Sequence, residues 1–404
     1  MKPTASRGGP TNATRPDRNR RPPEPANARR VALDALAAVE GGARANVVVP
    51  DLLSSSQLDA RDRALVTELV YGTTRMRRAC DWLIDRHTRS QLDVEVRAAL
   101  RLGAYQLAWM RVPAHAAVSA TVEEVRGPGR SVVNAILRRV AEQLAVGPVA
   151  WPDPATQLSY PDWIVDQLAR DLGPEPARGA LLTMNEAAGM TVRSDGYVQD
   201  RASQLVAAHV GVQPGERILD VCAAPGGKAT AMASDGPALV VAADLSPDRA
   251  DMMAANATRL GARQMVTVVA DGLMPPWRPA SFDRVVVDAP CSGLGVLRRR
   301  PDARWRVQPA DVARLAELQR RLLAGALPLV RPGGLLVYSV CTLTGSETRG
   351  IDGWLARTAP DLIPVPPPGP PWQPAGRGGL LLPQTAGTDG MYVLSLRVPA
   401  PPRR

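Results

Sequence analysis

The sequence predicts an all-helical domain followed by an α/β domain with a doubly wound, mostly parallel sheet. Apolar residues recur at helical spacing between residues 28 and 146, whereas short β-branched runs alternate with helical stretches after residue 163. The chain has 404 residues, of which 45% are hydrophobic, which is enough for two domains with their own cores. We therefore expect domains over 28–146 and 163–404, joined by a proline-rich linker over 147–162.

The elements of the helical domain follow from apolar spacing and helix stop signals. A first helix is expected around residues 31–39, because its apolar residues share one face and a glycine pair at 41–42 ends it. Pro113 lies just beyond another apolar-periodic stretch and marks its end. The remaining helices are expected over the ranges 59–75, 93–110, 115–126 and 131–145.

The second domain begins with two helices and continues as alternating strands and helices. Five strands of the parallel sheet are expected at Arg217–Val221, Ala238–Asp244, Met265–Val269, Arg284–Asp288 and Gly334–Val340. Two closing strands are expected at Leu380–Pro383 and Met391–Val398. The Pro-rich segment 364–374 is expected to be a surface loop in polyproline conformation.

The positive charge of the chain is concentrated at its start. The net charge is +10, and residues 1–30 alone hold eight basic and two acidic side chains. Residues 1–27 lack apolar periodicity and are predicted to form a disordered basic tail. Such a tail favours a polyanionic partner, most simply nucleic acid, and the alternative is an extension that only aids solubility.

Several classes of protein are disfavoured by the sequence. The longest apolar runs are too short for a membrane span, and the start shows no secretory signal. The four cysteines, at 80, 222, 291 and 341, include no CxxC pair, so we expect no metal site, no disulfide framework and a cytoplasmic protein. The three histidines (His87, His115 and His209) lie in helix-like stretches without a nucleophile motif, which disfavours Ser-His-Asp catalysis.

A glycine-rich turn after the first predicted strand indicates a ligand site. Residues 218–230 read ILDVCAAPGGKAT, and glycines in such a turn let backbone N–H groups approach a ligand at the carboxyl edge of the sheet. Acids end or follow the next strands, at Asp244, Asp271 and Asp288. Successive acids on one rim favour a nucleoside ligand, and the absence of GxGxxG argues against a dinucleotide. S-adenosyl-L-methionine, with its ammonium and sulfonium charges, suits these acids.

Two cysteines follow neighbouring strands at the same rim. Cys291 lies in VVVDAPCSGLGVLRRRPD (285–302) and Cys341 in LLVYSVCTLTGSE (335–347). A thiolate that adds to carbon 6 of a pyrimidine makes carbon 5 nucleophilic enough to take a methyl group. Asp288 is expected to contact the edge of the base, where a protonated form would donate a hydrogen bond.

Basic side chains that follow Cys291 in the sequence are candidates for binding RNA. A cluster of arginines after Cys291 is expected either to hold RNA phosphates or to form a solvated turn: Arg298, Arg299, Arg300, Arg304 and Arg306. Lysine occurs only at Lys2 and Lys228, so Lys228 is a candidate active-site residue, with a surface lysine at a helix start as the alternative.

These motifs resemble a known family. Residues 199–204, 218–230, 283–302, 336–347 and 388–392 are similar to the motifs of RNA (cytosine-5) methyltransferases, and the stretches 62–75, 100–118 and 132–139 resemble a NusB-like RNA-binding domain. This layout is that of the Sun/Fmu (RsmB) family of 16S rRNA (cytosine-5) methyltransferases. The resemblance implies a NusB-like helical domain followed by a Rossmann-like class I S-adenosylmethionine-dependent methyltransferase domain.

The resemblance also implies roles for individual residues. Cys341 is the implied nucleophile, Cys291 assists release of the product, and Asp288 and Lys228 belong to the active site. The implied substrate is one cytosine in a hairpin loop of 16S rRNA, which must be unstacked to react. We expect a monomer. The implied cofactor contacts are Cys222, Ala223, Ala224, Pro225, Gly226, Gly227, Lys228, Asp244, Asp271 and Asp288.

Three alternatives remain open from the sequence. Cys291 is the nucleophile if the chain follows the DNA cytosine-5 methyltransferases, which use a Pro-Cys motif. The RNA substrate is tRNA if the chain follows related enzymes. A non-catalytic RNA-binding factor with a relict cofactor fold is the third alternative, which the intact cysteines, acids and glycine turn disfavour.

Overall fold

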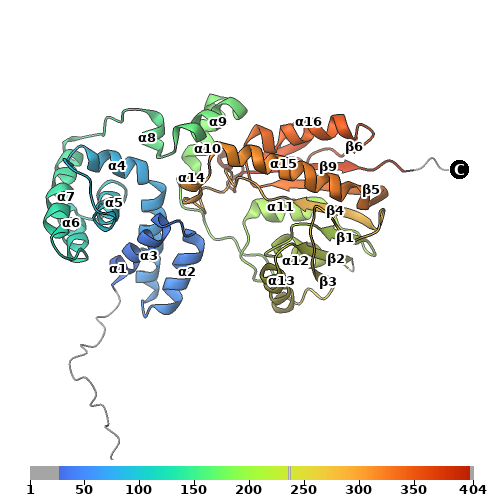
Figure 1. Cartoon of the computed structure of the whole chain (residues 1–404), viewed down its shortest axis with the longest axis horizontal. Coiled ribbons are helices and arrows are strands. Elements are labelled where there is room, and N and C mark those ends of the chain that lie inside the picture. Colours follow the sequence, from blue (N-terminus) through green and yellow to red (C-terminus); the bar gives the residue numbers. More distant parts are fainter. Residues whose placement is uncertain (1–26, 235, 237, 401–404) are drawn as a thin grey trace, which may run out of the picture.

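The computed structural model describes residues 27–400 except 235 and 237. A helical domain and a sheet-containing domain lie side by side (Figure 1), as the sequence predicts. Residues 1–26 of the predicted basic tail lie outside the described residues. Asn27, the last residue of that tail, is described, and its side chain accepts a hydrogen bond from Arg29 N at the start of the first helix.

The helical domain packs its helices around α5, which is buried on most sides. Leu100 and Leu102 of α5 are fully buried, and Asp59 caps α3 by accepting a hydrogen bond from Asp62 N. The sequence missed α2 and α4. The bounds are α1 (Ala28–Glu40), α2 (Ala45–Ser55), α3 (Ala60–Arg75), α4 (Arg77–Asp85), α5 (Val94–Trp109), α6 (Ala114–Glu123) and α7 (Gly129–Val146).

The predicted linker, residues 147–162, is an ordered segment. It contains α8 (Pro154–Leu158), whose first turn is capped by the Asp153 side chain through Thr156 N. Proline is compatible with the first position of a helix, so its presence here starts a helix instead of preventing one. Tyr160 is fully buried and donates a hydrogen bond to Leu181 O. Two helices follow, α9 (Asp162–Leu172) and α10 (Pro174–Thr183).

The second domain contains one sheet with the strand order β3-β2-β1-β4-β5-β9-β8-β7. Along this order, the five strands from β3 through β2, β1 and β4 to β5 pair in parallel. The strands β9, β8 and β7 extend the sheet by antiparallel pairing. The short β6 pairs with β9. The bounds are β1 (Arg217–Asp220), β2 (Leu239–Asp244), β3 (Met265–Val269), β4 (Phe282–Asp288), β5 (Val330–Val340), β6 (Ile363–Pro364), β7 (Gln373–Ala375), β8 (Gly378–Leu381) and β9 (Met391–Arg397).

Helices cover both faces of the sheet, which confirms the predicted doubly wound domain. Apolar residues of α11 (Arg201–Val210), α12 (Gly227–Ser234) and α13 (Pro247–Leu260) form one core with the strands. Residues of α15 (Pro309–Ala326) and α16 (Arg349–Thr358) form a core on the opposite face. The strand order reverses between β1 and β4, and ligands bind at such a reversal, beyond the carboxyl ends of the strands.

Short elements close the sheet domain. The helices α14 (Ala303–Arg306) and α17 (Pro383–Ala386) each span a single turn. The Pro-rich segment 364–374 is bounded by β6 and β7, and its Trp372 is buried, with 5% of its surface exposed. The expected surface loop therefore contributes an anchor to the core.

Arg304 of α14 joins the two domains. Its side chain is fully buried, and Nη1 donates to Arg75 O (3.2 Å), to Ser159 O (3.1 Å) and to Asn185 Oδ1 (2.9 Å). The guanidinium lies 3.8 Å from the centre of the Tyr160 ring. Because these partners occupy it inside the protein, Arg304 is not available to RNA phosphates, and the expectation for this residue is wrong.

Replacing Arg304 with alanine is expected to lower the free energy of unfolding by about 3–5 kcal/mol, because buried oxygens lose their donor and a cavity forms beside Tyr160. Urea denaturation measures this change. Arg314→Ala is the matched control, since Arg314 is 67% exposed and pairs only with Asp311 in its own helix. An equal loss in the two variants contradicts the junction role of Arg304.

Candidate active site

The glycine-rich turn lies between β1 and α12, where the sequence places it. Gly226 has a φ of +96°, in the left-handed region that favours glycine. A side chain on Gly227 would meet Gln199 Nε2 and Tyr197 Cε1 at 3.0 Å. The turn therefore needs glycine for its conformation at one position and for close packing at the next. It leads directly into the N-terminus of α12, and the first N–H groups of a helix are free to bind an anion.

Asp220 is a buried carboxyl without a partner. It ends β1, is fully buried, and neither carboxyl oxygen has a hydrogen-bond partner among the described residues. Burial, reinforced by the nearby Asp288 carboxylate, raises the pKa of Asp220 to about 7. A buried carboxyl without donors is costly unless a cation or donor reaches it. The sequence places this residue at the carboxyl end of the first strand, as the first of four acids on the rim, although it was not among the predicted cofactor contacts.

The other predicted acids lie at the same rim. Asp244 ends β2, is buried, accepts a hydrogen bond from Ser246 N (3.1 Å) and lies 3.4 Å from Arg249 Nη2. Asp271 follows β3 and accepts from Leu273 N at 2.8 Å. In each acid the backbone N–H contacts only Oδ1. The second carboxyl oxygen, Oδ2, is not used by that contact and could accept a hydrogen bond from a ligand.

Lys228 and Asp288 form an ion pair across the rim. Lys228 Nζ lies 2.6 Å from Asp288 Oδ2, and Ser339 Oγ donates to Asp288 Oδ1 at 2.7 Å. Burial lowers the pKa of Lys228, but the Asp288 carboxylate outweighs it and the pKa is raised. Both carboxyl oxygens of Asp288 therefore have partners within the protein, Lys228 and Ser339.

The two predicted thiols are in contact. Cys291 Sγ lies 3.3 Å from Cys341 Sγ, and Gly295 N donates to Cys341 O (3.1 Å), which ties the two loops together. A hydrogen bond from Cys291 lowers the pKa of Cys341, assisted by Lys228. The same hydrogen bond raises the pKa of Cys291, as do burial and Glu347. The two pKa shifts are opposite in direction, which favours Cys341 as the more readily ionised thiol of the pair.

Cys222 differs from these two thiols. It lies in the glycine-rich turn, and burial, together with Asp220 and Asp288, raises the pKa of its thiol. Reactive cysteines are those with a lowered pKa, so Cys222 remains a neutral side chain of the turn.

Glu347 holds both thiol loops and was not predicted. It is fully buried, and its carboxylate accepts hydrogen bonds from Ser292 N (2.9 Å), Ser292 Oγ, Thr344 Oγ1 (2.7 Å) and Gln319 Nε2 (3.0 Å). Ser292 is next to Cys291, and Thr344 lies in the loop of Cys341. The only signal in the sequence was its place at the end of the 335–347 motif.

Most of the predicted phosphate-binding arginines have partners inside the protein. Arg299 donates to Asp200 Oδ2 (2.7 Å) and Asp389 Oδ2 (3.0 Å), and burial with Asp200 raises the pKa of Asp389 to about 7. Arg298 is 11% exposed and donates to the carbonyls of residues 387 and 388. Only Arg300 and Arg306 of the set are exposed, and Arg306 pairs with Asp302.

Two further properties concern the residues that the structure describes. No group of three His, Cys, Asp or Glu side chains in 27–400 (235 and 237 apart) is arranged to hold a metal ion. None of the described helices combines the length and the apolar character needed to cross a membrane.

Comparison with known proteins gives two family matches and close relatives. Residues 26–142 match the NusB family, and residues 207–397 match the model described as 16S rRNA methyltransferase RsmB/F. A putative methyltransferase of Mycobacterium tuberculosis is 38% identical, over 94% of this chain and 97% of that protein. Ribosomal RNA small subunit methyltransferase B of Thermus thermophilus is 36% identical, over 91% and 97% of the two chains.

A further relative and a solved structure agree with these matches. The probable ribosomal RNA small subunit methyltransferase B of Bacillus subtilis is 31% identical, over 91% of this chain and 98% of that protein. The crystal structure of PH0851 shares the fold, with a TM-score of 0.76 and 18% identity over 92% of this chain and 98% of that chain. The chain belongs to the RsmB/F family of 16S rRNA methyltransferases, with a NusB-family domain at its start.

Proposed function

We propose that the protein transfers a methyl group from S-adenosylmethionine to carbon 5 of one cytosine in 16S rRNA through a covalent cysteine adduct. The observation that carries this proposal is the pair of thiols 3.3 Å apart, with Cys341 on the side of the Lys228 cation. The names of the relatives support ribosomal RNA as the substrate. Their agreement over more than nine-tenths of the chain favours rRNA over tRNA.

The rim fits the cofactor. Both orphaned oxygens of Asp220 suit a cationic group, and the tight turn at Gly226 and Gly227 leaves backbone N–H groups for an anionic carboxylate. Bound there, S-adenosylmethionine supplies an electrophilic methyl group on a sulfonium. Asp244 and Asp271 are proposed to accept hydrogen bonds from its ribose hydroxyls and its adenine amino group. The segment from Cys222 to Lys228 forms the remaining contacts.

Cys341 begins the reaction. Its thiolate donates an electron pair to carbon 6 of the cytosine, which forms a carbon–sulfur bond and makes carbon 5 an enamine carbon. The enamine electron pair of carbon 5 would then form the bond to the methyl group, while the methyl–sulfur bond of the sulfonium would break and leave its electron pair on that sulfur. Lys228 is proposed to donate to ring nitrogen 3, where negative charge develops, and Asp288 holds the ammonium in place.

Cys291 completes the reaction. After methylation, carbon 5 carries both a hydrogen and a methyl group, and a base must remove the hydrogen as a proton. The electron pair of that bond restores the double bond between carbons 5 and 6, and Cys341 leaves as a thiolate. While Cys341 is bonded to carbon its sulfur has no charge, so the interaction that raises the pKa of Cys291 is relieved. Cys291 would then lose its proton to solvent, and the resulting thiolate would accept the proton from carbon 5 and become a neutral thiol again.

The helical domain is proposed to bind the RNA around the target. The cytosine must leave its stack to reach the thiols, and a NusB-family domain recognises the shape of the RNA beside it. We expect the enzyme to act as a monomer in the cytoplasm. The alternative nucleophile, Cys291, is disfavoured because the hydrogen bond with Cys341 raises its pKa.

Bisulfite sequencing of 16S rRNA and tRNA from cells with and without the gene tests the function. Loss of one 16S cytosine mark is the expected result. Loss of a tRNA mark instead would support cytosine methylation but contradict 16S rRNA as the substrate. Unchanged marks in both RNAs contradict the proposal.

Asp220→Asn is expected to stabilise the free protein and weaken cofactor binding about tenfold, because a cationic ligand loses its charged partner. The folded pKa of about 7 exceeds the unfolded value of about 3.9. The folded form therefore binds the proton more tightly, and the carboxyl destabilises the fold increasingly as the pH rises between these values. The stability gain of the variant should grow across that range and then level off.

Urea denaturation at several pH values and calorimetric titration with S-adenosylmethionine measure the two effects. Asp248→Asn, which changes an exposed acid at the start of α13, is the control. Wild-type cofactor affinity in Asp220→Asn shows that this carboxyl does not face the cofactor.

A further inference from the structure

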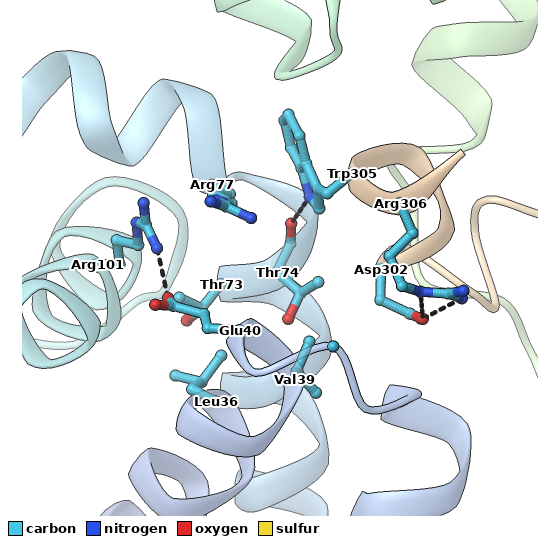
Figure 2. Close-up of a pocket in the computed structure, with 11 residues that line it drawn as sticks. Leu36, Val39, Glu40, Thr73, Thr74, Arg77, Arg101, Asp302, Trp305 and Arg306 are labelled. Atoms are coloured by element: carbon cyan, nitrogen blue, oxygen red, sulfur yellow. Dashed lines mark hydrogen bonds and ion pairs between the residues drawn. The ribbon is translucent and has the colours of Figure 1, made fainter. Parts of the chain in front are cut away.

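A pocket lies where the helical domain meets the sheet domain (Figure 2). Its volume is about 110 Å³, whereas a single water needs on the order of 10–15 Å³. Thr73, Thr74 and Arg77 line it from the helical domain, and Asp302 and Trp305 line it from the segment that follows Cys291. The lining also includes Gly42 and Arg306, which are exposed, so the pocket reaches the surface.

Three of the residues that line the pocket each carry a buried side-chain oxygen without a partner. Thr73 Oγ1, Thr74 Oγ1 and Asp302 Oδ1 make no hydrogen bond within the described part of the chain. These residues are 1%, 5% and 2% exposed. Buried polar atoms are normally paired, since an unpaired one costs free energy. A carboxylate oxygen only accepts, whereas a hydroxyl donates or accepts, so the missing partner must carry hydrogen-bond donors.

Arg77 adds an unpaired charge beside an aromatic ring. Its guanidinium lies 5.6 Å from the centre of the Trp305 ring and makes no hydrogen bond or ion pair with any described residue. By contrast, Arg101 and Arg306, which also line the pocket, pair with Glu40 and Asp302. Trp305 is held by a hydrogen bond from Nε1 to Thr74 O at 2.6 Å. A free guanidinium next to a fixed aromatic ring suits a phosphate and an unstacked base.

We propose that this pocket binds one unpaired nucleotide of the RNA, separate from the cytosine that is methylated. The proposal rests on the proposed function for RNA as the ligand. Arg77 holds the phosphate, Trp305 contacts the base, and the orphaned atoms of Thr73, Thr74 and Asp302 bond to base or ribose groups. A simple anion fits less well, because it brings no donor for Asp302 Oδ1 and is repelled by that carboxylate.

The position of the pocket gives this nucleotide a purpose. Arg75, next to Thr74, donates to Arg298 O at 3.1 Å, in the segment between Cys291 and Asp302. A nucleotide bound here therefore contacts the helical domain and the continuation of the Cys291 loop together. It fixes the RNA relative to the thiols at a point outside the methyl-transfer site.

Two variants of the full-length chain test the proposal by filter binding to 16S rRNA transcribed in vitro. Arg77→Gln is expected to weaken binding about tenfold and to reduce the slope of log affinity against log salt by about one, as the loss of one phosphate contact does. Thr73→Val is isosteric and is expected to weaken binding about threefold without changing the slope. Its stability should equal or exceed that of the wild type, because it removes an unpaired hydroxyl.

Arg86→Gln is the matched control. The Arg86 guanidinium lies 4.3 Å from the centre of the Trp82 ring in the same domain and is exposed. The substitution therefore removes the same charge at a position outside the pocket. If both pocket variants bind rRNA like the wild type, or if Arg86→Gln weakens binding equally, the pocket proposal is wrong. Should Arg77→Gln fail to fold, Thr73→Val and Thr74→Val decide.

Methylation is measured separately in the same proteins. If the wild type methylates 16S rRNA and the pocket variants bind it as tightly as the wild type, the pocket proposal is wrong and the proposed function is retained. If the pocket variants bind 16S rRNA more weakly but the wild type methylates no cytosine, the proposed function is wrong and the pocket proposal is retained.

Discussion

Cys341→Ala is expected to abolish both methylation and the covalent protein–RNA complex, because no other thiolate is in place to add to carbon 6. Cys341 has the lowered pKa of the contacting pair, whereas Cys291 is held neutral by the same hydrogen bond. Loss of a nucleophile typically reduces turnover on the order of 10⁴-fold or more. Incubation with 16S rRNA and S-adenosylmethionine, followed by denaturing electrophoresis, detects the complex.

Cys291→Ala is expected to give the opposite result for the complex. The adduct still forms through Cys341, but the proton at carbon 5 has no base in place, so the adduct persists as a denaturant-resistant band. Cys80→Ala, which changes a buried thiol of the helical domain, is the control and should behave like the wild type. A persistent complex in Cys341→Ala, with none in Cys291→Ala, reverses the two roles.

The pH dependence distinguishes the pair from independent thiols. Adduct formation requires the Cys341 thiolate, so its rate falls as the pH drops through the pKa of Cys341. The hydrogen bond from Cys291 lowers that pKa, and Cys291→Ala removes the donor. The rate profile of adduct formation in Cys291→Ala should therefore shift to higher pH than in the wild type. An unchanged profile means that the contact does not stabilise the thiolate.

The parallel strands were predictable because each carries its own signal, whereas the short β6 and β7 were not predicted. The β-branched runs at β1, β2 and β3 are local, and their predicted positions agree with the structure within a residue. The helices α2 and α4 carried weaker signals. The first contains Pro50, and the second is separated from α3 by Met76 alone. Their apolar faces are buried by the rest of the domain, which is tertiary information.

The site was predictable where chemistry concentrates in one motif. Asp288 ends β4, Cys291 and Cys341 follow β4 and β5, and Lys228 lies at the start of α12. The parallel sheet brings these positions together. Arg304 shows the limit of this reasoning. It lies in a run of arginines that reads as exposed, yet its partners come from three distant segments. Residues defined by partners that are remote in sequence leave no local pattern.

Glu347, like Arg304, is defined by partners that are remote in sequence. Its replacement is the second substitution for which we expect a large effect. Glu347→Ala should lower the free energy of unfolding by about 3–5 kcal/mol, because several buried donors lose their acceptor together. Methylation should fall at least about 100-fold, since the loops that carry the two thiols lose their common anchor. Urea denaturation and initial rates on 16S rRNA measure the two changes. Glu317→Gln, at a residue 60% exposed in α15, is the control.

Glu347→Gln separates anchoring from electrostatics. The amide keeps the shape of the side chain and one acceptor oxygen but removes the charge, which is one of the causes that raise the pKa of Cys291. With that charge gone, Cys291 becomes more acidic and therefore a stronger donor to the Cys341 thiolate, so the pH profile of adduct formation should move to lower pH. A variant that loses stability but keeps the wild-type profile assigns Glu347 to anchoring alone. A shifted profile in a protein that retains its fold assigns it to both, because a merely structural contact does not move the titration of the thiol pair.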